Sequence, residues 1–203
     1  METANAIGIL NTKEPHKKLG HVMVDLETMG NKSNSVICSI GAVEFDINTG
    51  ETGLEFYVKV DMQSCLERGM IVNADTIEWW LMQSEAARLK VTMGDGMNIT
   101  QALHGFKLYL EELGISTVQL WGNGVRFDMG ILEDAYRACK LREPWNFRCE
   151  RDVRTLVSFA PEVKDHYPKF GVEHNPIDDC KYQIGYCTAI WQKINNLSFI
   201  TNP

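Results

Sequence analysis

The stretch His21-Val-Met-Val-Asp-Leu-Glu27 decides the fold prediction, because it reads as a β-strand that ends in two acids. Its β-branched and apolar residues are those that strands prefer. Asp25 and Glu27 are two positions apart, so a strand would direct both side chains to one face. Two carboxylates about 4 Å apart repel by roughly 4 kcal/mol at an effective dielectric near 20, which favours a bound cation. Two solvated acids at a strand end are the alternative interpretation.

Further strands and helices follow along the chain. An apolar run covers residues 36–46, and the turn Asn48-Thr49-Gly50 leads into the alternating segment 54–60, which together predict an antiparallel meander. Beyond it, we expect helices over 75–89, 98–114, 128–140, 152–159 and 178–194, and strands over 117–121 and 145–149. The pattern predicts an α/β fold, with a mixed five-stranded sheet flanked by helices.

Two of these helices have recognisable ends. Asp75 and Glu78 form a capping box that should open the helix over 75–89. Asn98 or Thr100 should open the next helix, which Gly114 should close.

Length and composition restrict the class of protein. With 203 residues, 44% hydrophobic and 23% charged, the chain should form one domain. We expect an N-terminal extension over 1–20, the domain over 21–195 and a C-terminal tail over 196–203. Apolar stretches are too short for a signal peptide or a membrane span, and the six cysteines include no C-x-x-C pair. We therefore expect a cytoplasmic protein with reduced thiols and no membrane partner.

The net charge of −7 argues against a protein that coats nucleic acid, because contacts of Lys and Arg with phosphates dominate such binding. It does not exclude a nuclease, since two bound divalent cations would raise the effective charge by about four. Basic residues gather between positions 126 and 169, where Arg151 and Arg154 are candidate phosphate contacts.

Three more residues complete a pattern with Asp25 and Glu27. Asp128 follows the predicted strand at 117–121, and His174 precedes Asp179 by five positions. In this order and spacing, the five residues resemble the DEDD exonucleases of the histidine subclass, which belong to the ribonuclease-H-like superfamily. The resemblance covers roughly residues 21–194. Within that group, the segments Asp75-Thr-Ile-Glu-Trp-Trp80 and Arg151-Asp-Val-Arg-Thr155 are most similar to the phage DexA-type exonuclease.

The resemblance implies a 3′-to-5′ exonuclease that uses two Mg²⁺ or Mn²⁺ ions, for which carboxylates are suitable ligands. By resemblance, Asp25 contacts both ions, Glu27 and Asp179 complete one site, and Asp128 acts mainly through a bound water. His174 would take the proton from the attacking water. The expected products are nucleoside 5′-monophosphates.

The resemblance also implies the partners. Single-stranded DNA 3′ ends are the expected substrate, RNA 3′ ends are the alternative, and relatives that form dimers suggest a homodimer. Thr28 and Met29 would cradle the terminal nucleotide, and Asn123 and Phe127 match family positions near the terminal sugar. The neighbours Trp79 and Trp80, and Trp80 in particular, are candidates for stacking on a base, with core packing as the alternative. Loop packing is the alternative for Met29.

The main residues have other interpretations. Asp128 could only start a helix, where an acid is favourable. His174 could be a surface histidine, or could join Cys180 and Cys187 in a zinc site that lacks a fourth ligand.

Asp178 could replace its neighbour Asp179, although the spacing from His174 favours Asp179. Asp152 with Thr155 is more typical of a helix cap than of a metal ligand. A catalytically silent nucleic-acid-binding subunit is a further alternative, which the five filled positions disfavour.

Overall fold

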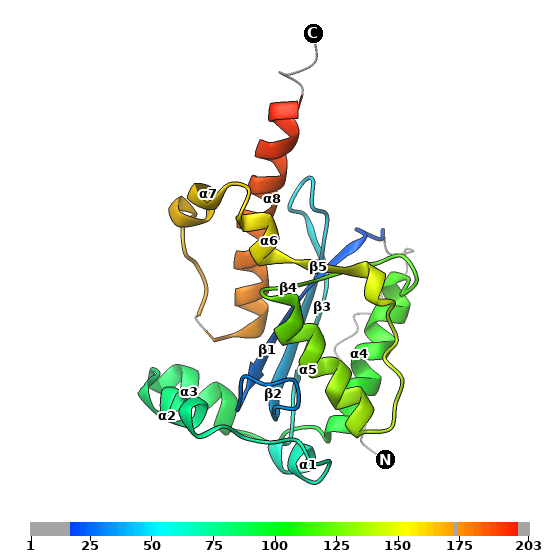
Figure 1. Cartoon of the computed structure of the whole chain (residues 1–203), viewed down its shortest axis with the longest axis vertical. Coiled ribbons are helices and arrows are strands. Elements are labelled where there is room, and N and C mark those ends of the chain that lie inside the picture. Colours follow the sequence, from blue (N-terminus) through cyan, green and yellow to red (C-terminus); the bar gives the residue numbers. More distant parts are fainter. Residues whose placement is uncertain (1–16, 173, 199–203) are drawn as a thin grey trace.

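The computed structural model describes residues 17–172 and 174–198. Its five strands form one mixed sheet in the order β3-β2-β1-β4-β5 (Figure 1). The predicted meander consists of β1 (His21–Thr28), β2 (Ile37–Phe45) and β3 (Thr52–Lys59). The strands β4 (Gln119–Gly122) and β5 (Glu150–Asp152) continue the sheet parallel to β1. The predicted mixed five-stranded sheet is therefore confirmed.

Helices cover both faces of this sheet (Figure 1). They are α1 (Met62–Leu66), α2 (Ala74–Met82), α3 (Glu85–Thr92), α4 (Ile99–Leu113), α5 (Val125–Ala138), α6 (Val153–Val157), α7 (Pro161–His166) and α8 (Pro176–Ser198), with a 3-10 turn η1 (Phe147–Cys149). One buried cluster joins Val22, Val24 and Leu26 of β1 to α4 and α5, whereas Met23 belongs to a second cluster with α6 and α8. Because side chains alternate along a strand, Asp25 and Glu27 lie on the face that α8 covers.

The region predicted as one helix over 75–89 consists of two helices. Asn73 caps α2, because its side-chain oxygen accepts a hydrogen bond from the Thr76 amide, so the predicted capping box of Asp75 and Glu78 is wrong. The chain becomes extended at Gln83, and the Ser84 hydroxyl accepts from the Ala87 amide to begin α3. A second strong N-cap residue therefore divides the segment.

The helix α4 has the predicted ends, capped by Asn98 at its start and by Gly114 with φ of 87° at its close. The strand predicted over 145–149 is wrong, because Trp145 is buried in the core and the strand begins only at Glu150. The short helices α1 and α7 were not predicted, since five or six residues do not establish a helical period.

The structure describes only part of the expected N-terminal extension and C-terminal tail. The helix α8 continues to Ser198, into the segment predicted as a tail. Residues 1–16 and 199–203, in the expected extension and tail, lie outside the described residues. Within the described part, no helix combines the length and the apolar character needed to cross a membrane.

Candidate active site

The strand β1 and the first turn of α5 bring three acids close together, and two of them, Asp25 and Glu27, line a cleft. Asp25 accepts a hydrogen bond of 3.0 Å from the side-chain amide of Gln183 on α8. Asp128 is buried, and its carboxylate accepts from the backbone amides of Leu26 and Asn123. Its position needs Gly122, because a Cβ there would lie 2.8 Å from an Asp128 carboxylate oxygen. Burial and these hydrogen bonds go beyond what an acid that only starts a helix requires.

The start of α8 supplies the fourth acid. The Asn175 side chain accepts from the Ile177 amide and so caps the helix. Asp178 turns away from the cleft, because its carboxylate accepts a hydrogen bond of 2.9 Å from the Val172 amide. Asp179 instead lies close to Glu27. The structure thus brings Asp179, not Asp178, to the other acids.

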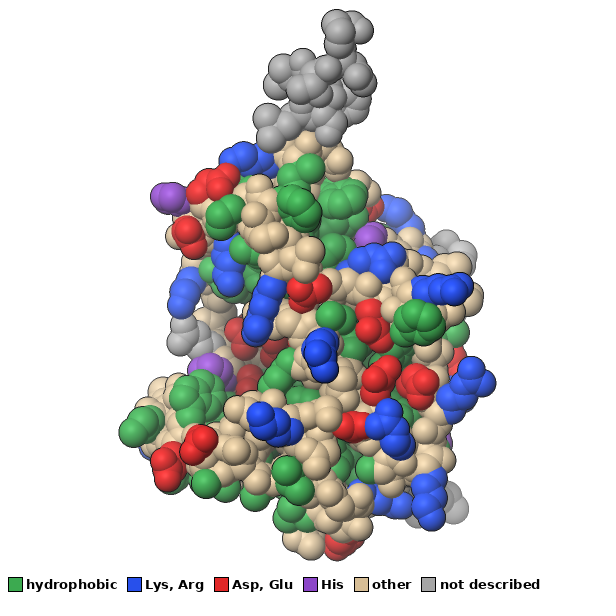
Figure 2. Space-filling view, in the orientation of Figure 1, with side chains coloured by type: hydrophobic (Ala, Val, Ile, Leu, Met, Phe, Trp, Pro, Cys, Tyr) green, Lys and Arg blue, Asp and Glu red, His purple; other side chains and the backbone are tan. Residues whose placement is uncertain are grey.

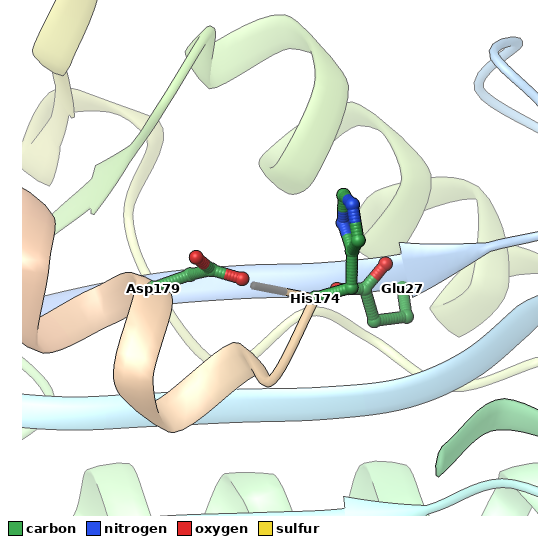
Figure 3. Close-up of side chains that lie close together, drawn as sticks. All are labelled: Glu27, His174 and Asp179. Carbon is green, nitrogen blue, oxygen red and sulfur yellow. The ribbon is translucent and has the colours of Figure 1, made fainter. Parts of the chain in front are cut away.

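Glu27, His174 and Asp179 converge from three different segments (Figure 3). Each offers one ligand atom, and these atoms all lie within 4.8 Å of one another. His174 precedes α8 with a left-handed backbone, at φ of 62°. Cys180 and Cys187 are buried in the core cluster between α8 and the sheet, so the structure provides no support for a zinc site with His174.

Burial and mutual repulsion disfavour ionised carboxylates in the metal-free site. Burial, followed by the charges of Asp128, Glu27 and Asp179, raises the pKa of Asp25 well above its ordinary value. Burial and the charges of Asp179 and Asp128 raise the pKa of Glu27 to about 8. Burial likewise raises the pKa of Asp128 to about 7, although backbone hydrogen bonds and Arg154 oppose the shift.

The donor set fits divalent cations. Four carboxylates offer hard oxygen ligands, which suit Mg²⁺ and Mn²⁺. A bound cation would reverse the electrostatic cost that raises these pKa values. In addition, the buried Gln183 Oε1 has no hydrogen-bond partner among the described residues, which leaves a polar atom beside Asp25 for a ligand or a water.

Two tryptophans of α2 form a wall of the cleft, which has a volume of about 480 Å³. The Trp80 indole donates a 2.9 Å hydrogen bond to the Thr28 carbonyl, and this side chain is buried. Trp79 is 43% exposed and also lines the cleft. The centroids of both rings lie 5.0 and 5.5 Å from the His174 ring, in edge-on contacts. Trp79 therefore presents the more accessible face for a base.

The remaining predicted contacts lie in four different places. Thr28, Asn123 and Phe127 line the cleft. Met29 packs in the core cluster beneath α4 and α5, which favours its alternative of loop packing.

The two arginines differ in position. Arg151 donates to the carbonyls of Arg148 and Glu150 at the exposed end of β5, away from the cleft lining, whereas Arg154 lines a groove next to the cleft. Asp152 caps α6, as predicted, by accepting from the Thr155 amide.

Among the cleft residues that the sequence did not single out, Gln183 contacts Asp25, and Lys164 of α7 has its ammonium 5.5 Å from the centroid of the Tyr186 ring. Trp79, which the sequence offered together with Trp80 as a candidate for stacking, contacts His174. Gln183 follows Asp179 by four positions, so one helix face carries both, which was the available signal for Gln183.

A mixed sheet with helices on both faces, and four acids that converge over its central strand, define a 3′-to-5′ exonuclease of the DEDD type with a ribonuclease-H-like fold. Comparison with protein families agrees. Residues 20–191 match the Rv2179c-like family, described as the 3′-5′ exoribonuclease Rv2179c-like domain. The chain belongs to this family.

Individual relatives include a protein named for DNA and structures solved with a ribonucleotide and with a DNA oligonucleotide. An exodeoxyribonuclease of Enterobacteria phage T4 is 28% identical over 208 residues, which cover 83% of this chain and 90% of that protein. The nuclease domain of 3′hExo, a DEDDh family member bound to rAMP, superposes with a TM-score of 0.59 at 14% identity, over 85% of this chain and 92% of that one. Exonuclease I of E. coli in complex with a dA16 oligonucleotide superposes with a TM-score of 0.59 at 14% identity, over 87% of this chain and 42% of that one.

The protein is therefore a hydrolase that removes nucleotides from the 3′ ends of nucleic acids. Exonucleases of the DEDD type generally use divalent metals, in agreement with the carboxylate cluster.

Proposed function

We propose that this protein hydrolyses single-stranded DNA from the 3′ end and releases nucleoside 5′-monophosphates. The observation that carries the proposal is the convergence of Glu27, His174 and Asp179 within 4.8 Å, beside the half-buried carboxylate of Asp25 and the buried carboxylate of Asp128. Asp25, Glu27, Asp128 and Asp179 would hold two Mg²⁺ or Mn²⁺ ions. When bound, such ions stabilise the charge that develops on the attacking and leaving oxygens of a phosphodiester displacement.

His174 is the proposed general base, and with this role the protein would belong to the histidine subclass. An imidazole titrates near neutrality and can take a proton from the attacking water at Nδ1 or Nε2. Trp79 and Trp80 contact the ring edge-on and restrict its orientation. Gln183 fixes Asp25 by donating to one carboxylate oxygen.

The walls of the cleft would hold the terminal nucleotide. Trp79 offers an exposed ring for stacking, and Asn123 and Phe127 line the same cleft. A paired 3′ end should react more slowly, because the terminal nucleotide must first leave the duplex at a cost of a few kcal/mol. Single strands are therefore the proposed substrate.

DNA is proposed over RNA because the phage T4 relative, which is similar along most of its length, is an exodeoxyribonuclease. An RNA substrate is the second candidate, favoured by the description of the matched family as exoribonucleases. The same acids serve both substrates, so only contacts with the sugar discriminate between them. The test is kcat/KM on matched DNA and RNA oligonucleotides at fixed salt, where a tenfold preference for RNA would assign the protein to the second candidate.

The homodimer suggested by the resemblance remains a prediction. Sedimentation equilibrium of the full chain would test it, with a single species at the monomer mass of 23.0 kDa as the contradicting result.

A further inference from the structure

A second hollow adjoins the active-site cleft, and we call it the basic groove. It has a volume of about 570 Å³, and its charged lining includes Lys32, Arg126 and Arg154. Asn31 and Phe127 line both the cleft and the groove, so the two spaces are continuous along these residues. Figure 2 shows acidic side chains inside a hollow, with Lys and Arg side chains on the surface beside it.

The three cations of the basic groove are available to a ligand. Each of these side chains is exposed, and none forms a salt bridge within the described part of the chain. The acid on the groove, Asp152, is already occupied, because its carboxylate accepts from the amides of Gly124, Val125 and Thr155.

Some cations elsewhere on the surface are paired with acids, namely Lys107 with Glu111, Lys181 with Glu55, and Lys193 with Glu162. What distinguishes Lys32, Arg126 and Arg154 is that all three line one groove beside the cleft that holds the acids. They create a locally positive surface on a protein with a net charge of −7.

The charge on either side of the groove restricts what it can hold. The helix α2, on the opposite side of the cleft, carries Asp75 and Glu78, which repel phosphates. Past Arg126, the adjoining hollow is lined by Glu133, Asp134 and Glu150. A polyanion that leaves the cleft would therefore follow the basic groove and meet repulsion at its far end.

We propose that the basic groove binds the sugar-phosphate backbone of the nucleotides that precede the scissile bond. This inference rests on the proposed function, since it assumes that the terminal nucleotide occupies the cleft. Lys32, Arg126 and Arg154 contact phosphates without reading the bases. Because acids end the groove, affinity rises with strand length over the first few nucleotides and then becomes constant.

The test compares the full-length wild type with a Lys32→Gln/Arg126→Gln variant and with the triple variant that adds Arg154→Gln. The control is Lys140→Gln/Arg142→Gln, which removes the same charge as the double variant but from exposed positions outside the groove. Binding of 5′-fluorescein single strands of two to ten nucleotides is measured by fluorescence anisotropy in EDTA, from 50 to 200 mM salt. Without metal or turnover, this measurement reports binding and not catalysis.

For wild type, three phosphate contacts to a single strand should give a slope of log K against log salt near −2, or a loss of roughly 20-fold over this range. The slope should approach −0.7 for the double variant and zero for the triple variant, while the control keeps the wild-type slope. The increase of affinity with length should disappear in the triple variant. A triple variant that keeps the wild-type slope and length dependence would overturn the proposal.

A second substrate separates this inference from the proposed function. The p-nitrophenyl ester of thymidine 5′-monophosphate has a scissile phosphate but no preceding nucleotide. With Mn²⁺, the ratio of kcat/KM for an eight-nucleotide strand to kcat/KM for the ester should fall about tenfold or more in the triple variant. The ratio is used because Arg154 also affects the pKa of Asp128. If wild type hydrolysed neither substrate, the proposed function would be wrong. The anisotropy slopes would still show whether the basic groove binds the sugar-phosphate backbone.

Discussion

Gly41 of β2 lies against Pro176, the first residue of α8. A Cβ on Gly41 would lie 2.4 Å from the Pro176 Cβ and 2.9 Å from its carbonyl carbon, so only glycine allows this approach. Gly41 is also the partner of Asp25 across the β1–β2 pair. The close contact therefore sets the distance between β1, which carries Asp25 and Glu27, and the turn of α8 that carries Asp179.

Gly41→Ala should displace the start of α8 and with it His174 and Asp179. We expect a loss of stability of about 1–3 kcal/mol from overpacking, and a larger relative loss of exonuclease activity at a temperature where the variant is folded. Urea denaturation and kcat would be measured together. Gly130→Ala, where a Cβ meets nothing within 4 Å, is the matched control. Wild-type kcat in a folded Gly41→Ala variant would contradict this role.

Stability of the metal-free protein should fall as pH rises. Glu27 has an ordinary pKa of 4.5 that is raised to about 8, and Asp128 one of 3.8 that is raised to about 7. At pH values between the ordinary and the raised pKa of each group, the folded state binds more protons than the unfolded state. The free energy of unfolding therefore decreases as pH rises through this range, and the decrease is complete by about pH 8. Mg²⁺ or Mn²⁺ should therefore raise the melting temperature more at pH 8 than at pH 5.5. Equal shifts at both pH values would count against the carboxylate cluster as the metal site.

Removal of one acid should reduce activity without reducing the stability of the metal-free protein. Asp25→Asn, Glu27→Gln, Asp128→Asn and Asp179→Asn should each reduce activity by orders of magnitude. In EDTA, Asp25→Asn should be at least as stable as wild type at pH 8, because it relieves repulsion among buried carboxylates. Asp178→Asn is the control, since that side chain turns toward Val172. An Asp25→Asn variant with nearly full activity would remove the two-metal hypothesis.

His174→Ala should lower kcat by roughly 10²–10⁴, the usual contribution of a positioned general base, with little change in metal affinity. His104→Ala and His166→Ala are controls, because those rings are exposed, donate to backbone carbonyls of their own helices and do not line the cleft. The measurement is single-turnover cleavage of labelled single strands. If His174→Ala changed affinity alone, His174 would be reassigned as a phosphate contact.

From the sequence we could predict the features that depend on local periodicity and on the order of strands and helices along the chain. Asp25 and Glu27 follow from the two-residue period of a strand, and the sheet follows from the meander and the later alternation. Asp128, His174 and Asp179 could be grouped only through the resemblance, because their meeting depends on three separate segments. The Gly41–Pro176 approach and the contact of Gln183 with Asp25 depend on how α8 packs against the sheet. Local sequence carries no direct signal for the Gly41–Pro176 approach, and for Gln183 it carries only the four-residue spacing from Asp179.

The most direct test of the central claim uses 5′-labelled and 3′-labelled single strands of one sequence, as DNA and as RNA, with purified wild type and Asp25→Asn. With Mg²⁺ or Mn²⁺, wild type should shorten 5′-labelled DNA stepwise and release the 3′ label at once as a nucleoside 5′-monophosphate, faster than from RNA. Chelator and Asp25→Asn should each abolish both results. Cleavage that persists in chelator, or that releases the 5′ label first, would contradict the account.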